Sequence, residues 1–162
     1  MDTAERDALI EKFRTAYDEF AAALDGIPKE AWLFKPEPKE WSVHEVIIHL
    51  ADSETNSYLR ARRLIAEPGQ PLMGYDQDVW AMKLDYHSQS TEDALQVTRL
   101  VRQMSYELIK DLPEETWGNT VVHPEYDKPY TFTRWLQIYA DHPRVHAEQV
   151  RNNHELWKKG QP

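Results

Sequence analysis

Two histidines four residues apart, His142 and His146, suggest metal chemistry. They lie in the stretch TFTRWLQIYADHPRVHAEQVRNNHELW, residues 131–157, where the spacing of apolar residues predicts a helix. On a helix, side chains four residues apart project from the same face, one turn apart. Trp135 and Tyr139 share that face, so we expect it to point into the protein. Two inward imidazoles at this spacing could bind zinc, nickel or iron.

We expect a third ligand, His49, from an earlier helix. Ser42 with Glu45 three residues later forms a capping box, which predicts that a helix starts at this point. Val46 and Leu50 mark the inward face of this helix, and His49 lies at its border. Three imidazoles from two helices would leave coordination positions free for water or a substrate, as in a catalytic metal site.

A simpler interpretation is that these histidines are ordinary core residues. The spacing His-x-x-x-His is a weak signal, and the zincin form has Glu directly after the first histidine, where this chain has Pro143. However, burying several imidazoles without partners costs roughly a few kcal/mol each. We therefore favour a metal site with His49, His142 and His146 as ligands.

The composition limits the classes of function. The chain has 162 residues, and we expect one domain over residues 1–162. The formal net charge of −9 argues against binding to nucleic acid, which depends on clustered Lys and Arg. There is no Cys, so a thiol used in the chemistry must come from a substrate.

The sequence gives no sign of a membrane segment. No apolar run approaches the ~18 residues of a membrane span. The N-terminal stretch MDTAERDALIEKF is acidic and amphipathic, unlike a signal peptide. We therefore expect a cytoplasmic protein that does not bind membranes.

Four amphipathic helices are predicted, at about residues 3–24, 42–66, 90–110 and 131–157. They indicate an all-α four-helix bundle, whose long connections favour a topology other than up-down-up-down. Pro143 predicts a kink in the last helix, or a restart capped by Asp141. The third helix is expected to bury an apolar stripe made of Ala94, Val97, Val101, Met104 and Leu108.

Other polar residues near the predicted site have weaker claims. Glu45, Asp52, Asp141 and Glu148 could orient the ligands, although a solvated charge on a helix face is the simpler interpretation for each. His44 lies about 180° around its helix from His49, so we expect it to be exposed.

Four segments together resemble the DinB-like family, also described as DinB/YfiT-type metalloproteins: WSVHEVIIHLADSE, GYDQDVWA, HPEYDKPYTF and YADHPRVHAEQV. The similarity extends from about Glu11 to Trp157. It implies a four-helix bundle with a three-histidine site for a divalent metal, formed here by His49, His142 and His146. Members of the family include bacillithiol transferase and mycothiol-dependent maleylpyruvate isomerase, and the family is often dimeric, which implies a homodimer.

Two functional hypotheses follow. The first is an enzyme in which a divalent ion, most simply zinc or nickel, activates a low-molecular-weight thiol that attacks an electrophilic small molecule, as in an S-transferase. A variant of this hypothesis is a hydrolase that activates water. The second is a non-catalytic bundle, for small-molecule binding or stress, in which the metal is structural or absent.

Overall fold

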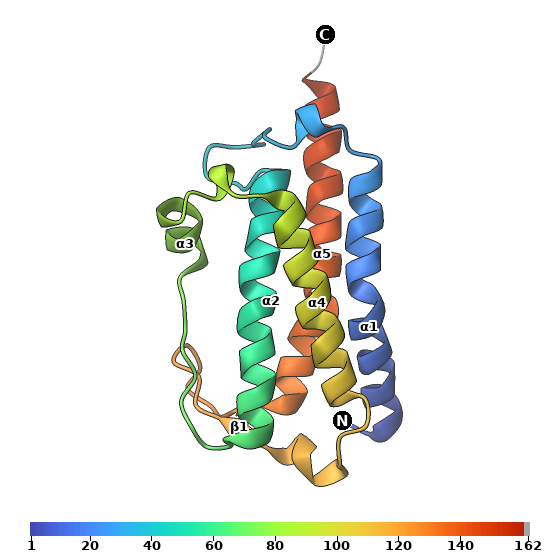
Figure 1. Cartoon of the computed structure of the whole chain (residues 1–162), viewed down its shortest axis with the longest axis vertical. Coiled ribbons are helices and arrows are strands. Elements are labelled where there is room, and N and C mark those ends of the chain that lie inside the picture. The colour runs from blue at the N-terminus through green and yellow to red at the C-terminus, as the bar shows by residue number, and fades with distance from the viewer. Residues whose placement is uncertain (161–162) are drawn as a thin grey trace.

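Four long helices form the body of the protein within residues 1–160, which the computed structural model describes (Figure 1). This confirms the predicted four-helix bundle. The long helices are α1 (Thr3–Asp25), α2 (Val43–Ala66), α4 (Thr91–Ile109) and α5 (Phe132–Lys159). The shorter elements are helix α3 (Gln77–Lys83), the 3-10 turns η1 (Lys29–Ala31), η2 (Tyr86–Ser88) and η3 (Glu114–Gly118), and strands β1 (Thr120–Val121) and β2 (Tyr130–Thr131).

The long helices do not alternate in direction along the chain (Figure 1). In this view α1 and α5 run upward, whereas α2 and α4 run downward. Because α1 packs against α5, and α2 packs against α4, each of these neighbouring pairs is parallel. The connection between α2 and α4 therefore has to return along the whole bundle, which explains its length. The topology differs from up-down-up-down, as predicted.

Hydrogen bonds from side chains fix where α2 begins. The backbone N–H of Glu45 donates to Ser42 Oγ at 3.2 Å, and the backbone N–H of Ser42 donates to Glu45 Oε2 at 2.8 Å. This is the predicted capping box. It sets the rotational frame of the helix, so that Val46, His49 and Leu50 are all buried.

A layer of buried polar side chains divides the core. One apolar cluster gathers around Phe20, Ile47 and Leu50, and the other around Phe13, Phe132 and Trp135. On α2 and α4 the intervening positions are polar and buried. They are Ser53, Glu54, Asn56, Ser57, Thr98, Arg102 and Ser105.

The apolar stripe predicted for the third helix is wrong at Val97 and Met104, although Ala94 is buried as predicted. Val97, Leu100 and Met104 of α4 are 42%, 47% and 51% exposed. Besides Ala94, the buried positions of α4 are Thr98, Arg102, Ser105 and Ile109. The physical reason is that α4 packs against the polar layer of α2, so its polar positions face inward and its apolar face is left at the surface.

The two long connections meet beside the bundle. The backbone N–H of Leu72 donates to Val122 O at 2.7 Å, and the N–H of Val122 donates to Gln70 O at 3.2 Å. Further along, a Cβ at Gly74 would lie only 2.8 Å from Pro124 Cγ, so a larger residue would push the two segments apart. These contacts hold one wall of a cleft beside α2 and α5.

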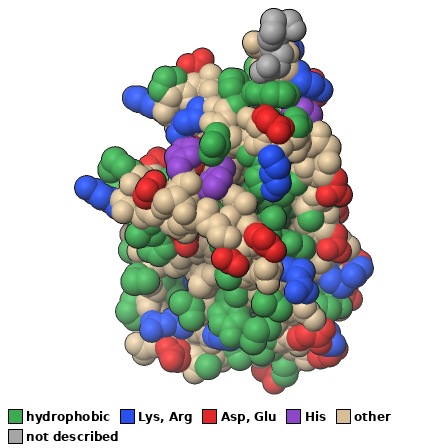
Figure 2. Space-filling model, turned by 45° about the horizontal axis from the view of Figure 1, so that its top comes forward, with side chains coloured by type: hydrophobic (Ala, Val, Ile, Leu, Met, Phe, Trp, Pro, Cys, Tyr) green, Lys and Arg blue, Asp and Glu red, His purple; other side chains and the backbone are tan. Residues whose placement is uncertain are grey.

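The surface offers a mixed pattern of charge. On the face shown in Figure 2, acidic and basic side chains are interspersed, and histidine side chains reach the surface in its upper part. None of the helices in residues 1–160 is long and apolar enough to cross a membrane.

Candidate metal centre

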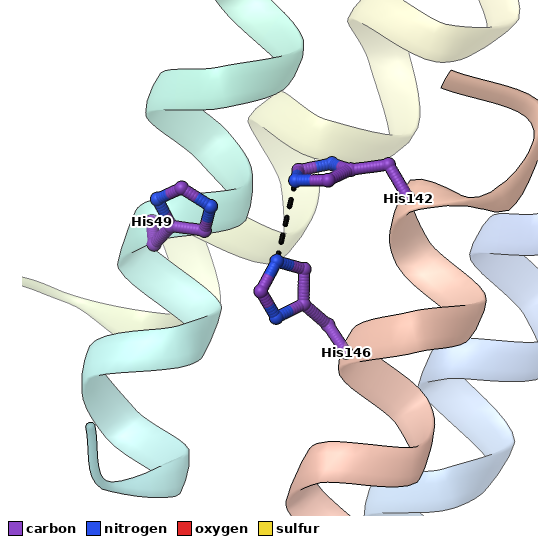
Figure 3. A group of neighbouring side chains, drawn as sticks. All are labelled: His49, His142 and His146. Carbon is purple, nitrogen blue, oxygen red and sulfur yellow. Dashed lines mark hydrogen bonds between the residues drawn. The ribbon is translucent and has the colours of Figure 1, made fainter. Parts of the chain in front are cut away.

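Three histidines lie together between α2 and α5 (Figure 3). His49 projects from α2, whereas His142 and His146 project from successive turns of α5. The ring centroids are 4.7 Å apart for His142 and His146, 5.5 Å for His49 and His142, and 5.0 Å for His49 and His146. One nitrogen from each ring lies within 4.8 Å of the other two. The residues predicted as ligands are therefore close enough to contact a single ion.

Hydrogen bonds orient the two rings on α5. His142 Nδ1 lies 3.2 Å from Glu54 Oε1, and His146 Nδ1 lies 2.7 Å from Gln149 Oε1. A carboxylate only accepts, so His142 carries a proton on Nδ1 and donates it to Glu54. The amide oxygen of Gln149 is also an acceptor, so we assign a proton to His146 Nδ1 in the same way. Both Nε2 atoms then present lone pairs toward the centre.

The spacing of these two Nε2 atoms suits a shared ion. They are 3.2 Å apart (dashed line in Figure 3). Two acceptors repel at this distance unless an ion lies beside both, or unless the Gln149 amide turns so that His146 donates through Nε2. Two nitrogens that each bind one zinc ion at ~2.0–2.1 Å have about this separation.

The protonation states also fit a metal. Burial, together with the neighbouring imidazoles of His146 and His142, lowers the pKa of His49 to about 2. Burial and His142 lower the pKa of His146 to about 4. Both rings are therefore neutral near pH 7, which is the form that binds metal. His49 Nδ1 is buried without a hydrogen-bond partner among the described residues, and the ring of Trp41 packs against the imidazole at 4.5 Å.

A buried ion pair supports His142 from behind. Glu54 and Arg102 are 1% and 3% exposed, and Arg102 Nη1 lies 2.8 Å from Glu54 Oε1. Burial alone would raise the pKa of Glu54, but Arg102 and His142 outweigh it and the pKa is lowered. Glu54 is therefore an ionised acceptor for His142 Nδ1–H. The sequence analysis did not predict this pair, because Glu54 and Arg102 lie on different helices and no local pattern in the sequence signals their contact.

Arg102 also compensates for the proline in α5. The helix continues through Pro143, so the predicted restart at Asp141 does not occur. Proline lacks the N–H that would bond to the carbonyl of Tyr139, four residues earlier. Arg102 Nη1 donates to that carbonyl at 3.1 Å instead. The Arg102 guanidinium therefore contacts both the carbonyl left without a partner by Pro143 and the carboxylate of Glu54. Glu54 in turn contacts His142, a candidate ligand.

The carboxylates considered in the sequence have other partners or none. Glu45 caps α2 and does not contact His49. Asp52 accepts a hydrogen bond from the Tyr86 hydroxyl at 2.6 Å. Asp141 pairs with Lys12, and Glu148 is exposed.

His44 is not exposed as predicted. It is partly buried because η2 packs over it, and its Nε2 lies 2.9 Å from the carbonyl oxygen of Tyr86. His123 is buried beside Tyr130, with ring centroids 5.1 Å apart. Neither belongs to the group that could hold an ion.

Two open clefts reach the centre from the surface. One, of about 810 Å³, is lined by His142, and the other, of about 800 Å³, is lined by His146. Gln77 and Asp78 of α3 line both clefts. His142 and His146 are thus accessible to small molecules from either side of α3, whereas His49 is buried and lines neither cleft.

The fold is a four-helix bundle with a three-histidine cluster that fits a metal site, and comparison with known proteins identifies the family. The chain belongs to the DinB superfamily, whose model matches residues 12–150. A candidate metal-dependent hydrolase of Oceanobacillus iheyensis is 31% identical over 110 residues, which cover 68% of this chain and 63% of that protein. The match thus spans less than two thirds of the relative.

Bacillus subtilis YfiT gives a second match. YfiT is also named as a candidate metal-dependent hydrolase. Its sequence is 24% identical over 110 residues, which cover 68% of this chain and 62% of YfiT. Its solved structure, described as having an unusual four-helix bundle topology, superposes with a TM-score of 0.87 at 20% identity. That superposition covers 98% of this chain and 89% of YfiT, so the two proteins share the fold.

The lowered pKa values predict how the metal-free protein responds to acid. The unfolded chain takes up protons on His49 and His146 near pH 6.5, whereas the folded protein resists until about pH 4 for His146 and about pH 2 for His49. The unfolding free energy should therefore be flat above pH 7 and fall from about pH 6.5 downward, by on the order of 2 kcal/mol per histidine at pH 5. Urea denaturation of chelator-treated protein at several pH values measures this fall.

The matched variant is His146→Asn, which removes one of the two titrating groups. Its unfolding free energy should fall by roughly 2 kcal/mol less than that of the wild type between pH 7 and pH 5. Equal slopes in the two proteins would show that His146 is not held neutral by burial.

The ion pair predicts a second result. Arg102→Met leaves Glu54 buried without its counter-charge, so the unfolding free energy should drop by about 3–5 kcal/mol. The double variant Glu54→Gln/Arg102→Met buries no charge and should recover part of that loss. Denaturation of the three proteins measures both effects. Wild-type stability in Arg102→Met would contradict the proposed role of the pair.

Proposed function

We propose that this protein is a metal-dependent enzyme whose divalent ion is held by His49, His142 and His146. The observation that carries the proposal is the convergence of three imidazoles beside two open clefts. The names of the curated relatives, which describe candidate metal-dependent hydrolases, support the same general class. Three neutral imidazoles suit zinc or nickel, and this donor set alone does not select between them.

The residues around the centre have defined tasks in this proposal. A divalent ion supplies Lewis acidity, which makes a thiol or a water molecule a nucleophile near neutral pH. Glu54 and Gln149 hold the protons of His142 and His146 on Nδ1, which leaves each Nε2 free as a ligand. Trp41 covers His49 and excludes water from that side of its ring.

Within this class we favour a thiol-dependent S-transferase. The chain has no Cys, so the thiol would come from a low-molecular-weight co-substrate. The carboxylate that contacts the histidines, Glu54, is engaged by Arg102 and His142 and is not free to take a proton from water. This supports a thiol, which is more acidic than water, as the nucleophile. A hydrolase is the second candidate because the relatives carry that name.

The experiment compares zinc-loaded and nickel-loaded wild-type protein with His142→Ala. Metal content and conjugation of an electrophile to several thiols are measured in parallel, with ester hydrolysis in the absence of thiol as the second arm. We expect the variant to bind the metal roughly tenfold or more weakly, because one of three ligands is lost. The rate of conjugation should fall with it. Equal metal binding in both proteins would reject the centre.

The same experiment separates the remaining possibilities. Hydrolysis without thiol-dependent conjugation would replace the transferase by the hydrolase. Tight metal binding with a higher melting temperature, but with neither activity, would favour the non-catalytic bundle with a structural metal.

We also propose a homodimer that forms through α4. Val97, Leu100 and Met104 lie on one face of this helix and are 42%, 47% and 51% exposed, although all three are apolar. A row of exposed apolar side chains on a long helix is typical of a surface that packs against a second helix. In a symmetric dimer the same face of each copy would cover the other.

Charge placed on this face should prevent association. We expect the double variant Leu100→Glu/Met104→Glu to elute as a monomer in light-scattering chromatography at concentrations where the wild type is dimeric. Both side chains point to solvent in the single chain, so its melting temperature as a monomer should change little. A monomeric wild type would reject the dimer.

A further inference from the structure

The cleft beside His142 contains a cation that no carboxylate within residues 1–160 neutralises. Its inner wall includes Ser53, Arg60, Tyr75 and Tyr139, which lie on α2, on α5 and in the connection after α2. Arg60 is half-buried and lies two helical turns after Ser53 on α2. No carboxylate among residues 1–160 lies within ion-pair distance of its guanidinium.

The hydrogen bonds of Arg60 are also incomplete. Its Nη1 donates to the Tyr139 hydroxyl at 3.0 Å. Its Nε is buried and has no partner within the described part of the chain. A guanidinium offers five N–H donors and stays charged, so this group retains most of its capacity to bind an anion. Arg102 also has a buried Nε without a partner in the described residues, but its charge is paired with Glu54, whereas Arg60 has no such carboxylate.

Two tyrosine hydroxyls add neutral donors to the same wall. Burial raises the pKa of Tyr139 to about 12 and also raises that of Tyr75, so both hydroxyls keep their protons. Tyr139 accepts from Arg60, and its hydroxyl also lies within hydrogen-bond reach of Ser53, so its O–H can donate either to Ser53 or to a ligand. A carboxylate placed here would therefore meet a charged fork and a neutral O–H donor together.

The same cleft leads to the three histidines. The ring of Tyr139 lies between the two features, since its hydroxyl contacts Arg60 and its ring centroid is 5.7 Å from that of His142. A molecule of a few carbon atoms bound at Arg60 would thus present its other end to the candidate metal centre.

The outer rim of the cleft has the opposite charge. Asp76, Asp78 and Glu125 line it and are exposed. These carboxylates disfavour a dianion such as phosphate, whereas a single carboxylate placed deep against Arg60 is tolerated. The arrangement selects for a monoanion and also admits a positive group at the rim.

We infer that this cleft binds the carboxylate of a small monocarboxylic substrate through Arg60, with the Tyr139 hydroxyl as a second donor. The reacting group of that substrate then lies at the three histidines. This last step depends on the proposed metal-dependent function, whereas recognition of the carboxylate does not.

The test of carboxylate recognition uses metal-free protein and proton–nitrogen NMR. The buried Arg60 Nε–H should give a resolved signal, which Arg60→Gln assigns by its loss. Titration with propionate should shift this signal and the backbone signals of Ser53 and Tyr75. Propionamide, which has the same shape without the charge, should leave them unmoved at equal concentration.

The control variant is Arg63→Gln, on the same helix but exposed and outside the cleft. It should bind propionate as the wild type does, whereas Arg60→Gln should bind it at least roughly tenfold more weakly. Arg60→Lys keeps the charge without the fork and should lie between them. Equal shifts with propionamide, or unchanged binding in Arg60→Gln, would overturn the inference, and tighter binding of phosphate would overturn the assignment to a carboxylate.

A second arm tests the link to the metal centre. Zinc-loaded protein should bind 3-mercaptopropionate at least roughly tenfold more tightly than 3-mercaptopropionamide, and Arg60→Gln should lose this preference while it keeps its zinc. If the protein binds no zinc but still prefers propionate over propionamide, the proposed metal function fails and the carboxylate site stands. If zinc binds and the preference is absent, the carboxylate site fails alone.

Discussion

The contact between Arg102 and Glu54 is the interaction on which the rest of this structure depends. Arg102 is on α4, Glu54 is on α2, and the guanidinium also donates to backbone carbonyls of Phe13 on α1 and Tyr139 on α5. One buried side chain therefore touches all four long helices. Removing such charges from water is costly, and the ion pair with Glu54 together with the hydrogen bonds to two carbonyls must offset that cost. The relative positions of the helices are constrained by this requirement, and His142 is oriented by the same carboxylate.

The local features of this protein could be predicted from the sequence because each depends on near neighbours. The capping box of Ser42 and Glu45 fixes the frame of α2, and that frame alone turns His49 inward. The helical spacing of His142 and His146 places both rings on one face of α5, whatever the rest of the chain does. Four helices and three candidate ligands follow from these short-range patterns.

The polar layer could not be predicted in the same way. Periodicity assigns apolar residues to the core, yet α4 buries Thr98 and Arg102 and exposes Leu100 and Met104. This inversion is caused by the carboxylate of Glu54 on another helix, and no local pattern states that the two charges will meet. His44 was misjudged for a related reason, since the turn that covers it comes from a distant part of the chain.

The parallel pairing of α1 with α5 has a consequence for how the protein is made. His49 lies in the second helix, but its two companions lie in the last one. During synthesis the first three long helices emerge before the rings of His142 and His146 exist, so the cluster is completed only when the final helix inserts between α1 and α2. An ion that binds at that stage would stabilise the newly assembled bundle, because only the complete bundle brings all three histidines together. Metal binding would therefore mark the end of assembly.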